Sequence, residues 1–218
     1  PDAVKHAGIT FLLFDMRQPG VEVRPLIQAN GAGHFAEVFL TDARCPVANV
    51  LGEVGGGWAP TRVVMANESA MIGGAAGNRA AKLIQLARLQ GRDDEPLVRQ
   101  QLADVHAREL LLSSMGEQIA AAARQRQAPP IDPSVVKLYV AESRRREGSL
   151  AQQLLGAAGT AVTHEASEWA MEQLLARYPI SIGGGTDELH HNNLAERALG
   201  LPRDIRPDKD VAWRDIPK

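Results

Sequence analysis

The hydrophobic period of this 218-residue chain changes at Trp58, and that change limits the folds open to it. Before Trp58, short apolar runs typical of β-strands occupy residues 9–16, 21–27 and 35–42. After Trp58, apolar residues recur every three or four positions, as they do on the buried side of an amphipathic helix. The sequence therefore predicts an α+β fold that is mainly α, with a short antiparallel β segment followed by helices.

Proline and glycine divide the helical part of the chain into separate helices. The predicted helices cover residues 59–90, 97–127, 132–158, 164–178 and 186–200. Because the predicted connections are short, consecutive helices should run antiparallel. We expect an up-and-down bundle of about four or five helices.

Composition excludes several classes of protein. The net charge is −2, and the basic run Arg144–Arg146 is followed by Glu147, which is typical of a solvated helix face rather than of a nucleic-acid site. No apolar run is long enough to span a membrane. The single cysteine, Cys45, rules out an internal disulfide and fits a reducing compartment. We expect a cytoplasmic globular protein that binds neither nucleic acid nor membrane.

A glycine-rich loop precedes the last predicted helix. Gly183–Gly185 let the backbone approach a ligand without an intervening Cβ, and Thr186 is a suitable N-cap for the helix that follows. An ordinary turn between two helices is the alternative interpretation. The pair His190 and His191 suggests no metal site, because adjacent helical side chains point about 100° apart.

The order of three motifs resembles the C-terminal half of an acyl-CoA dehydrogenase. Gly55–Trp58 resembles the family's "Gly-x-Gly-Trp/Phe", Gly184–Thr186 its "Gly-Gly-Thr" turn, and residues 195–202 its "Ala-Glu-x-x-Leu-Gly-Leu-Pro". The resemblance extends from about Gly8 to Arg203. It implies that about 150 family residues precede Pro1, so that the chain is a fragment.

The resemblance also implies three parts. Residues 1–50 would be the C-terminal part of a β-sheet or barrel middle domain, residues 51–203 the helical-bundle domain, and residues 204–218 an irregular tail.

Glu68 is the candidate catalytic base. It lies ten residues after Trp58, where relatives of the isovaleryl type carry their catalytic glutamate. We expect it to be half-buried at the edge of an apolar helix face; a solvated surface glutamate is the alternative. Ser69 replaces the arginine that follows in those relatives. The base of medium-chain-type enzymes would fall at Gly184, which has no side chain, so Gly184 and Gly185 would instead bind the substrate carbonyl through the backbone.

FAD contacts are implied in two segments. One contains Gln153, Gly156 and Ala157, which in relatives face the neighbouring subunit, although glycines here would also suit a simple helix kink. The other is the start of the last helix, at Thr186 and Glu188. The family's "Arg-x-x-Phe-Gly" is absent after the first helix; only Arg88 or Arg92 could substitute for its charge.

The activity implied by the resemblance is FAD-dependent dehydrogenation of an acyl-CoA thioester to the 2-enoyl-CoA, with electrons passed to an electron-transfer flavoprotein. The assembly would be a homodimer, homotetramer or heterotetramer. Two alternatives stay open. One is a non-catalytic structural subunit of a heteromeric dehydrogenase, which the departures at Ser69, Ala157 and Gly184 and the missing "Arg-x-x-Phe-Gly" favour and the presence of Glu68 opposes. The other is an acyl-CoA oxidase. By itself the chain is expected to bind FAD weakly or not at all.

Overall fold

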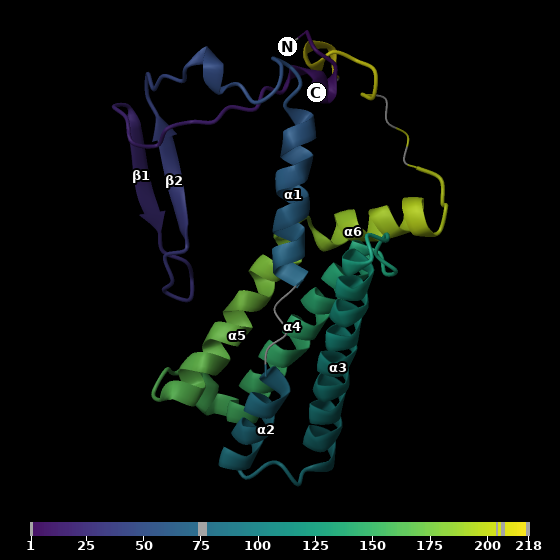
Figure 1. Cartoon of the computed structure of the whole chain (residues 1–218). Coiled ribbons are helices and arrows are strands. Elements are labelled where there is room, and N and C mark those ends of the chain that lie inside the picture. Colours follow the sequence, from purple (N-terminus) through teal and green to yellow (C-terminus); the bar gives the residue numbers. More distant parts are fainter. Residues whose placement is uncertain (1, 74–77, 204, 206–207, 217–218) are drawn as a thin grey trace. The chain divides into compact units, whose positions relative to one another are not determined.

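The computed structural model describes residues 2–73, 78–203, 205 and 208–216. They form two compact units, Pro1–Asn67 together with Pro202–Lys218, and Glu68–Leu201. A small antiparallel sheet and a set of helices (Figure 1) confirm the predicted α+β, mainly α class. In the described parts, no helix combines the length and apolarity needed to cross a membrane. The predicted three-part division at residues 50 and 203 stays a prediction.

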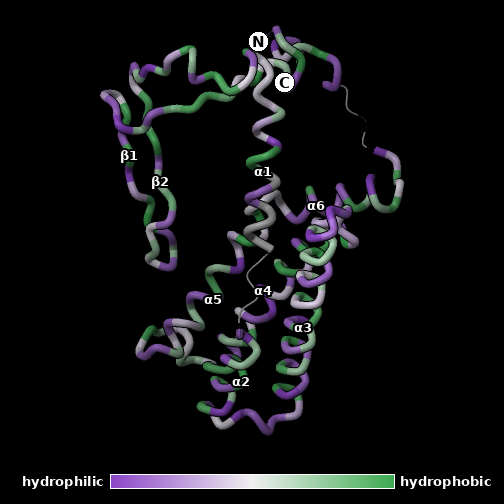
Figure 2. The backbone as a smooth tube through the Cα atoms, in the orientation of Figure 1, coloured by the Kyte–Doolittle hydropathy of each residue, from purple (hydrophilic) through white to green (hydrophobic). Residues whose placement is uncertain are grey.

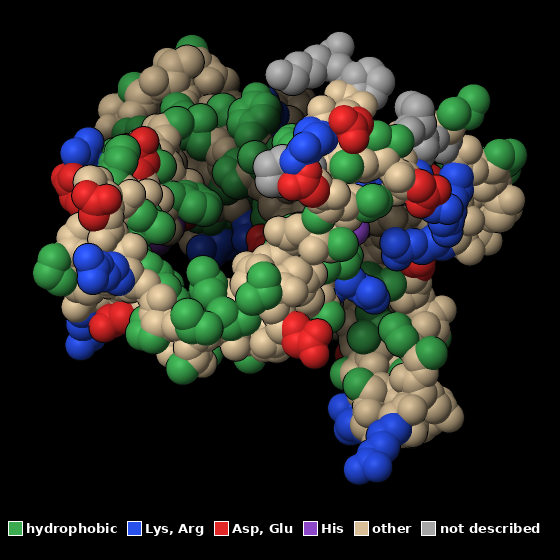
Figure 3. Space-filling view, turned by 90° about the horizontal axis from the view of Figure 1, so that it is seen from above, with side chains coloured by type: hydrophobic (Ala, Val, Ile, Leu, Met, Phe, Trp, Pro, Cys, Tyr) green, Lys and Arg blue, Asp and Glu red, His purple; other side chains and the backbone are tan. Residues whose placement is uncertain are grey.

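The sheet of the first unit has two strands. β1 (Val21–Leu26) pairs antiparallel with β2 (Phe35–Leu40), with Val21 opposite Leu40 and Leu26 opposite Phe35. Apolar side chains of this ribbon are open to solvent on both faces. Val23 and its partner Val38 lie on one face and are 51% and 47% exposed, and Leu26 and its partner Phe35 lie on the other and are 43% and 58% exposed. The space-filling view shows apolar side chains gathered at the surface on this face of the molecule (Figure 3).

The strand predicted over residues 9–16 is wrong. Ile9 and Leu12 make only isolated bridges, to Gly56 and Val50. The partner segment turns repeatedly at glycines and so cannot extend the pairing. Gly57 passes very close to the segment, because a Cβ at Gly57 would lie 2.5 Å from the backbone nitrogen of Phe11. The segment is thus held by a glycine connector instead of a strand.

Six α-helices follow among the described residues. They are α1 (Trp58–Gly73), α2 (Arg79–Leu89), α3 (Pro96–Arg124), α4 (Pro133–Leu155), α5 (Glu165–Ile182) and α6 (Asp187–Asn193). The single helix predicted over residues 59–90 is therefore two helices, and residues 74–77 between them lie outside the described residues. A 3-10 turn, Gly156–Thr160, follows α4, and a π-helical turn, Leu194–Ala198, extends α6 to the predicted end at Gly200.

The predicted end of the fourth helix before Pro179 is also wrong. α5 continues through Pro179 to Ile182, and the Pro179 carbonyl accepts a hydrogen bond of 2.8 Å from the Gly183 N–H. Proline removes one N–H donor but keeps its carbonyl, so the chain can add a last helical turn after it. The glycine loop consequently starts directly where α5 ends.

α4 is the central helix of the second unit, because it packs against α2, α3, α5 and α6. Polar and apolar stretches alternate along α3 and α4 (Figure 2), as expected for helices with one buried side. The core lies where these helices meet. It is made by Leu83, Leu86, Val98, Leu102, Val105, Leu150, Leu154, Leu155 and several alanines.

The basic run on α4 is solvated only in part, because Arg145 and Arg146 have 43% and 49% of their side chains exposed whereas Arg144 is mostly buried. Arg144 and Glu147 form an ion pair of 2.7 Å, with only 11% and 6% of their side chains exposed. Arg145 and Arg146 both pair with Glu142, at 3.2 and 2.8 Å. Each of the three arginines is therefore paired with an acidic residue of the same helix, Glu142 or Glu147.

Gly148 should be the most sensitive contact between α4 and α5. A Cβ there would lie 2.7 Å from the Gln173 carbonyl oxygen and 3.1 Å from the Leu174 Cα. Gly148→Ala must push the two helices apart, so we expect it to lower the free energy of unfolding by about 1–3 kcal/mol. Gly116→Ala is the matched control, because a Cβ at Gly116 meets nothing within 4 Å; it should be neutral or stabilising. Urea unfolding of the complete protein measures the free energy of unfolding of each variant. Equal changes in this free energy for the two substitutions would contradict the prediction.

Candidate functional site

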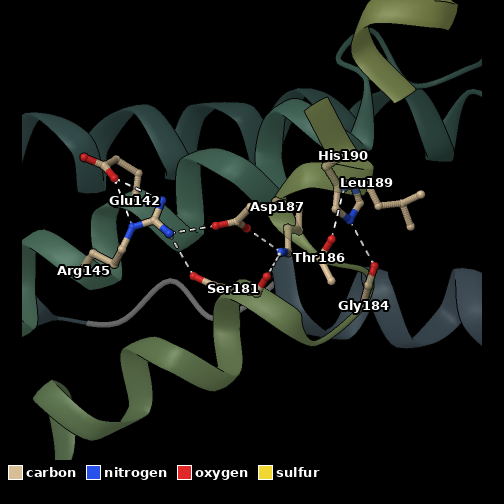
Figure 4. Close-up of polar contacts among 9 residues, drawn as sticks. Glu142, Arg145, Ser181, Gly184, Thr186, Asp187, Leu189 and His190 are labelled. Atoms are coloured by element: carbon tan, nitrogen blue, oxygen red, sulfur yellow. Dashed lines mark hydrogen bonds and ion pairs between the residues drawn. The ribbon is translucent and has the colours of Figure 1, made fainter. Parts of the chain in front are cut away.

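The glycine turn joins the end of α5 to the start of α6 (Figure 4). Gly184 and Gly185 have φ angles of 66° and 104°, a region that favours glycine. A Cβ at Gly185 would lie 3.1 Å from His190 Nε2. Glycine at position 185 is therefore required both by backbone conformation and by space, and the turn presents backbone instead of side chains.

Thr186 caps α6, as the sequence predicts. Its hydroxyl accepts a hydrogen bond of 3.2 Å from the Leu189 N–H. Glu188, in the first turn of α6, is exposed. Its own backbone N–H and the Thr186 hydroxyl hold the pKa of the Glu188 carboxyl below its usual value. A carboxylate at this position disfavours a phosphate and suits the hydroxyl groups of a ligand.

A buried ion cluster lies behind the turn. Asp187 is 7% exposed, and its two oxygens accept hydrogen bonds from Lys137 Nζ at 2.6 Å and Arg145 Nη1 at 2.7 Å. The same two cations reach Ser181 at the end of α5, through its carbonyl at 3.1 Å and its hydroxyl at 2.9 Å. The cluster of Lys137, Arg145, Ser181 and Asp187 therefore ties α4, α5 and α6 together around the glycine turn. Figure 4 shows Arg145, Ser181 and Asp187 of this cluster converging beside the turn.

The charge of Asp187 is stabilised by this cluster. Burial raises the pKa of the Asp187 carboxyl, but the hydrogen bonds from Lys137 and Arg145 outweigh it and hold this pKa below the usual value. Asp187 is thus a carboxylate whose charge is compensated inside the protein. It is not available to a ligand, in contrast to Glu188.

His190 contacts the glycine turn directly. Its side chain is buried, at 7% exposed, and its Nε2 lies 3.0 Å from the Gly184 carbonyl oxygen. A carbonyl only accepts hydrogen bonds, so Nε2 must carry the hydrogen. The other ring nitrogen, Nδ1, has no hydrogen-bond partner within the described part of the chain. Neighbouring His191 is exposed, and the residues described contain no group of three or more His, Cys, Asp or Glu side chains that could hold a metal ion.

The Gln153 segment lies at the other end of α4. Sixteen residues separate Lys137 from Gln153, which corresponds to about 24 Å along a helix. The Gln153 Oε1 accepts a hydrogen bond of 3.0 Å from Gln101 Nε2, and its backbone carbonyl accepts one of 2.7 Å from Arg92. A groove of about 330 Å³ opens here, lined by Gln100, Gln101, Asp104, Val105, Arg146, Ser149, Leu150 and Gln153.

Gly156 and Ala157 are exposed beyond the end of α4. A Cβ at Gly156 would meet nothing within 4 Å, so a close helix crossing does not explain this glycine. Its φ of 57° explains it instead, because this angle ends α4 and starts the 3-10 turn. Both residues are accessible to a ligand or to another chain.

Comparison with known proteins places these features in a family. The family model described as "Acyl-CoA dehydrogenase, C-terminal domain" matches residues 55–199, which is more than half of the chain. The chain belongs to the acyl-CoA dehydrogenase family. The family resemblance inferred from the motifs is thereby confirmed.

Similar acyl-CoA dehydrogenases are known from mycobacteria. The chain is 34% identical over 207 residues to acyl-CoA dehydrogenase IpdE1 of Mycolicibacterium smegmatis, covering 93% of the chain and 51% of that protein. It is 35% identical over 209 residues to acyl-CoA dehydrogenase FadE34 of Mycobacterium tuberculosis, covering 93% of the chain and 28% of that protein. The chain thus spans about half of the first relative's length and about a quarter of the second's.

Two solved structures share the fold of this chain. The structure titled "Tcur3481-Tcur3483 steroid ACAD" superposes with a TM-score of 0.80 at 22% identity, over 94% of this chain and 55% of that one. The ChsE4–ChsE5 complex from Mycobacterium tuberculosis superposes with a TM-score of 0.71 at 24% identity, over 92% of this chain and 55% of that one. At 22% and 24% identity, these two structures show only that their fold is shared with this chain.

Glu68, the candidate base of this acyl-CoA dehydrogenase chain, lies on α1 and is exposed. The expected half-buried environment is therefore absent from the structure of the chain by itself. Nothing is described of the Ser69 side chain, which lies outside the described residues. The assignment of Glu68 as the base stays a prediction that rests on its spacing from Trp58.

Arg88 and Arg92, the two possible substitutes for the arginine of the missing motif, each form an ion pair with an acidic residue. Arg92 contacts Glu95 at 2.7 Å, and Arg88 lies 3.8 Å from Asp93. Arg92 nevertheless contacts Gln153, so the structure does bring the shortened connector beside one predicted cofactor segment. Its positive charge is already compensated there.

Sequence reasoning missed Lys137, Asp187 and His190. A signal for Lys137 was present, because it precedes the buried residues Val140 and Ala141 by three and four positions and so lies on the apolar side of α4. A lysine on such a face needs a buried partner. The identity of that partner, Asp187, depends on how α6 folds back on α4, which no local pattern specifies.

Proposed function

We propose that this chain forms the C-terminal part of a flavin-dependent acyl-CoA dehydrogenase, which converts an acyl-CoA thioester to the 2-enoyl-CoA. The observation that carries the proposal is the glycine turn. At Gly184 and Gly185, the two positions implied to bind substrate, the backbone adopts angles that favour glycine, and His190 fixes one carbonyl. Backbone N–H groups of such a turn can stabilise the negative charge that develops on a thioester carbonyl oxygen.

Glu68 is the proposed base that removes the α-proton of the thioester. A carboxylate is suited to this role if it lies within hydrogen-bond reach of the α-carbon's proton. Its exposure in this chain leaves it accessible to a substrate. Gly184 has no side chain with which to share the role.

The chain's own residues suit the uncharged parts of FAD. Amide and hydroxyl groups of Gln100, Gln101, Ser149 and Gln153 line the groove beside α4, and such groups fit a ribose or an adenine. The nearby cations Arg92 and Arg146 are already paired with carboxylates. We infer that the negative pyrophosphate is bound mainly by residues outside this chain, as are the groups that hold the flavin ring. When bound, FAD would supply the acceptor for the β-hydride.

The proposed partners follow from the same assignment. Electrons would pass to an electron-transfer flavoprotein, and the protein would assemble as a homodimer, homotetramer or heterotetramer. The exposed Gly156 and Ala157 suit contact with a neighbouring subunit. A steroid-bearing thioester is one proposed substrate class, because a structure of this fold is titled a steroid acyl-CoA dehydrogenase.

A structural subunit of a heteromeric dehydrogenase is the second candidate. The pairing of Arg88 and Arg92 with acidic residues favours it, because the positive charge of each is partly compensated before a cofactor phosphate could bind. In that case a partner subunit would supply the reacting site. The glycine turn and its buried cluster would then act only in packing.

Flavin content and flavin reduction test the proposal. The complete protein should be purified by itself and with candidate partner subunits, and its flavin absorbance followed with isobutyryl-CoA, octanoyl-CoA and a steroid-bearing propanoyl-CoA. We expect bleaching with at least one of these thioesters. Absence of bleaching by itself, together with restored activity of a flavin-poor partner, would favour the structural subunit. Bleaching that oxygen reverses rapidly, without an electron-transfer flavoprotein, would favour the acyl-CoA oxidase alternative.

A further inference from the structure

The C-terminal tail, residues 208–216, folds back on the first residues of the chain. Ala212 and Val4 form an antiparallel bridge, and the Trp213 N–H donates to the Ala3 carbonyl at 3.2 Å. Both end segments belong to the first compact unit and lie beside the start of α1 (Figure 1). Neither lies in the part of the chain that the family model matches, so the family assignment gives their contact no role.

Two ion pairs hold this contact. Lys5 Nζ lies 2.8 Å from Asp208 Oδ2, with 26% and 37% of their side chains exposed, and Arg214 pairs with Asp2. Lys5 has a φ of 38°, in the left-handed region that residues other than glycine rarely adopt. A residue keeps such a conformation only where its surroundings hold it there. The tail is therefore part of what fixes the N-terminal segment.

The N-terminal segment in turn contacts the first residue of α1. The His6 ring stacks on the Trp58 ring, with 3.8 Å between the ring centroids and 4° between the ring planes. Directly before the helix, the Gly57 N–H donates to the Ile9 carbonyl at 2.8 Å. The start of α1 is thus held by a ring stack and a backbone hydrogen bond. His6, which supplies the stack, follows directly on Lys5, which the tail holds.

α1 connects these contacts to the candidate base. Glu68 lies ten residues after Trp58 on this helix, which corresponds to about 15 Å along its axis. Because a helix is a rigid element over such a length, a displacement of its first turn also displaces Glu68. A general base acts only within hydrogen-bond reach of the proton that it removes. A small displacement of the first turn should therefore lower the rate of proton removal.

We propose that the C-terminal tail is an intramolecular clip and that His6 is a positioning residue, which together fix the start of α1 and thereby the place of Glu68. The effect on Glu68 rests on the proposed dehydrogenase function, whereas the clip does not depend on it. The clip is made by polar groups that are partly exposed, so single charge changes should open it. Opening removes no group that contacts the thioester, and should therefore lower the rate of flavin reduction more than the affinity for the thioester.

Hydrogen exchange of the complete, flavin-containing protein tests the clip without a substrate. Asp208→Lys replaces the attraction to Lys5 by repulsion, and it should speed exchange of the amides of residues 61–67 about 3- to 10-fold. Exchanging the two charges, as in Lys5→Asp with Asp208→Lys, should restore the wild-type rate. Asp210→Lys is the matched control, because Asp210 is an exposed aspartate of the same tail, and it should change nothing. Equal exchange in Asp208→Lys and wild type would overturn the clip.

Two substitutions of His6 test the link between the clip and α1. His6→Ala removes the ring stack and should speed exchange of the same amides, whereas His6→Phe keeps a flat ring over Trp58 and should restore most of the protection. With the most reactive of the three thioesters, His6→Ala and Asp208→Lys should each slow flavin reduction about 3- to 10-fold and change the Kd less than about 2-fold. Failure of His6→Phe to recover what His6→Ala loses would overturn the role of the ring.

The two readouts separate the clip from the proposed function. Wild-type rates of flavin reduction in Asp208→Lys and His6→Ala, in a protein that Glu68→Gln slows, would overturn the positioning of Glu68 and leave dehydrogenation intact. If no thioester reduces the flavin of the wild-type protein, the dehydrogenase proposal fails, and the role at Glu68 fails with it. Hydrogen exchange still decides in that case whether the tail fixes the start of α1.

Discussion

Replacing Glu68 by Gln should slow reduction of the bound flavin by its best acyl-CoA about 10²- to 10⁴-fold. This is the usual contribution of a positioned general base, and glutamine keeps the shape of the side chain while removing the proton acceptor. Because Gly184 carries no side chain, no second carboxylate at the glycine turn can take over. The affinity for the thioester and the flavin content should barely change.

Stopped-flow absorbance of the complete protein measures this effect. Glu117→Gln is the matched control, because Glu117 is an exposed glutamate on another helix, α3. It should leave the reductive rate within experimental error of wild type. An unchanged rate in Glu68→Gln would exclude Glu68 as the base and would require a base elsewhere in the protein.

Removal of Asp187 should produce the largest loss of stability. Its partner Lys137 has only 5% of its side chain exposed, so Asp187→Ala would leave an unpaired charge in the interior. We expect the free energy of unfolding to fall by about 3–5 kcal/mol. Replacing both partners, as in Lys137→Met with Asp187→Leu, removes the charge together with its partner, and this double variant should recover much of the loss unless Arg145 also requires Asp187.

A surface ion pair and the pH dependence of stability provide two checks on the prediction for Asp187. Glu22→Ala breaks a pair with Arg24 whose side chains are more than half exposed, and it should cost less than about 1 kcal/mol. The folded-state pKa of Asp187 is lowered, below an unfolded value of about 3.9. Its contribution is therefore present above about pH 4 and is lost as pH falls through the folded value. A destabilisation by Asp187→Ala that is small, or that grows toward low pH, would contradict this account.

The sequence predicted those parts of the fold that depend on local chemistry. Periodicity after Trp58 indicated the helices, and the Thr186 cap was located to the residue. The strand over residues 9–16 was predicted wrongly, because pairing needs a continuous partner and residues 49–57 turn too often to supply one. The passage of α5 through Pro179 was missed because a proline carbonyl can still accept the next helical bond.

The candidate site was predictable only in part. The glycine turn and Glu188 could be found from residue types at fixed spacing. The ion cluster could not, since Lys137 and Asp187 are 50 residues apart in the sequence and meet only because α6 folds onto α4. The hydrogen bond between His190 and the Gly184 carbonyl is likewise a property of three-dimensional packing.

α4 separates the ion cluster behind the glycine turn, at Lys137, from the candidate cofactor segment, at Gln153, by about 24 Å. Substitutions more than about 10 Å apart, with no shared partner, combine additively. Substitutions could therefore remove the function of the candidate cofactor segment in an acyl-CoA dehydrogenase chain without affecting the glycine turn. Substitutions at the glycine turn could likewise leave the cofactor segment intact. If a gene duplicates and each copy loses the function of a different segment, an enzyme that acts by itself becomes a pair of complementary subunits.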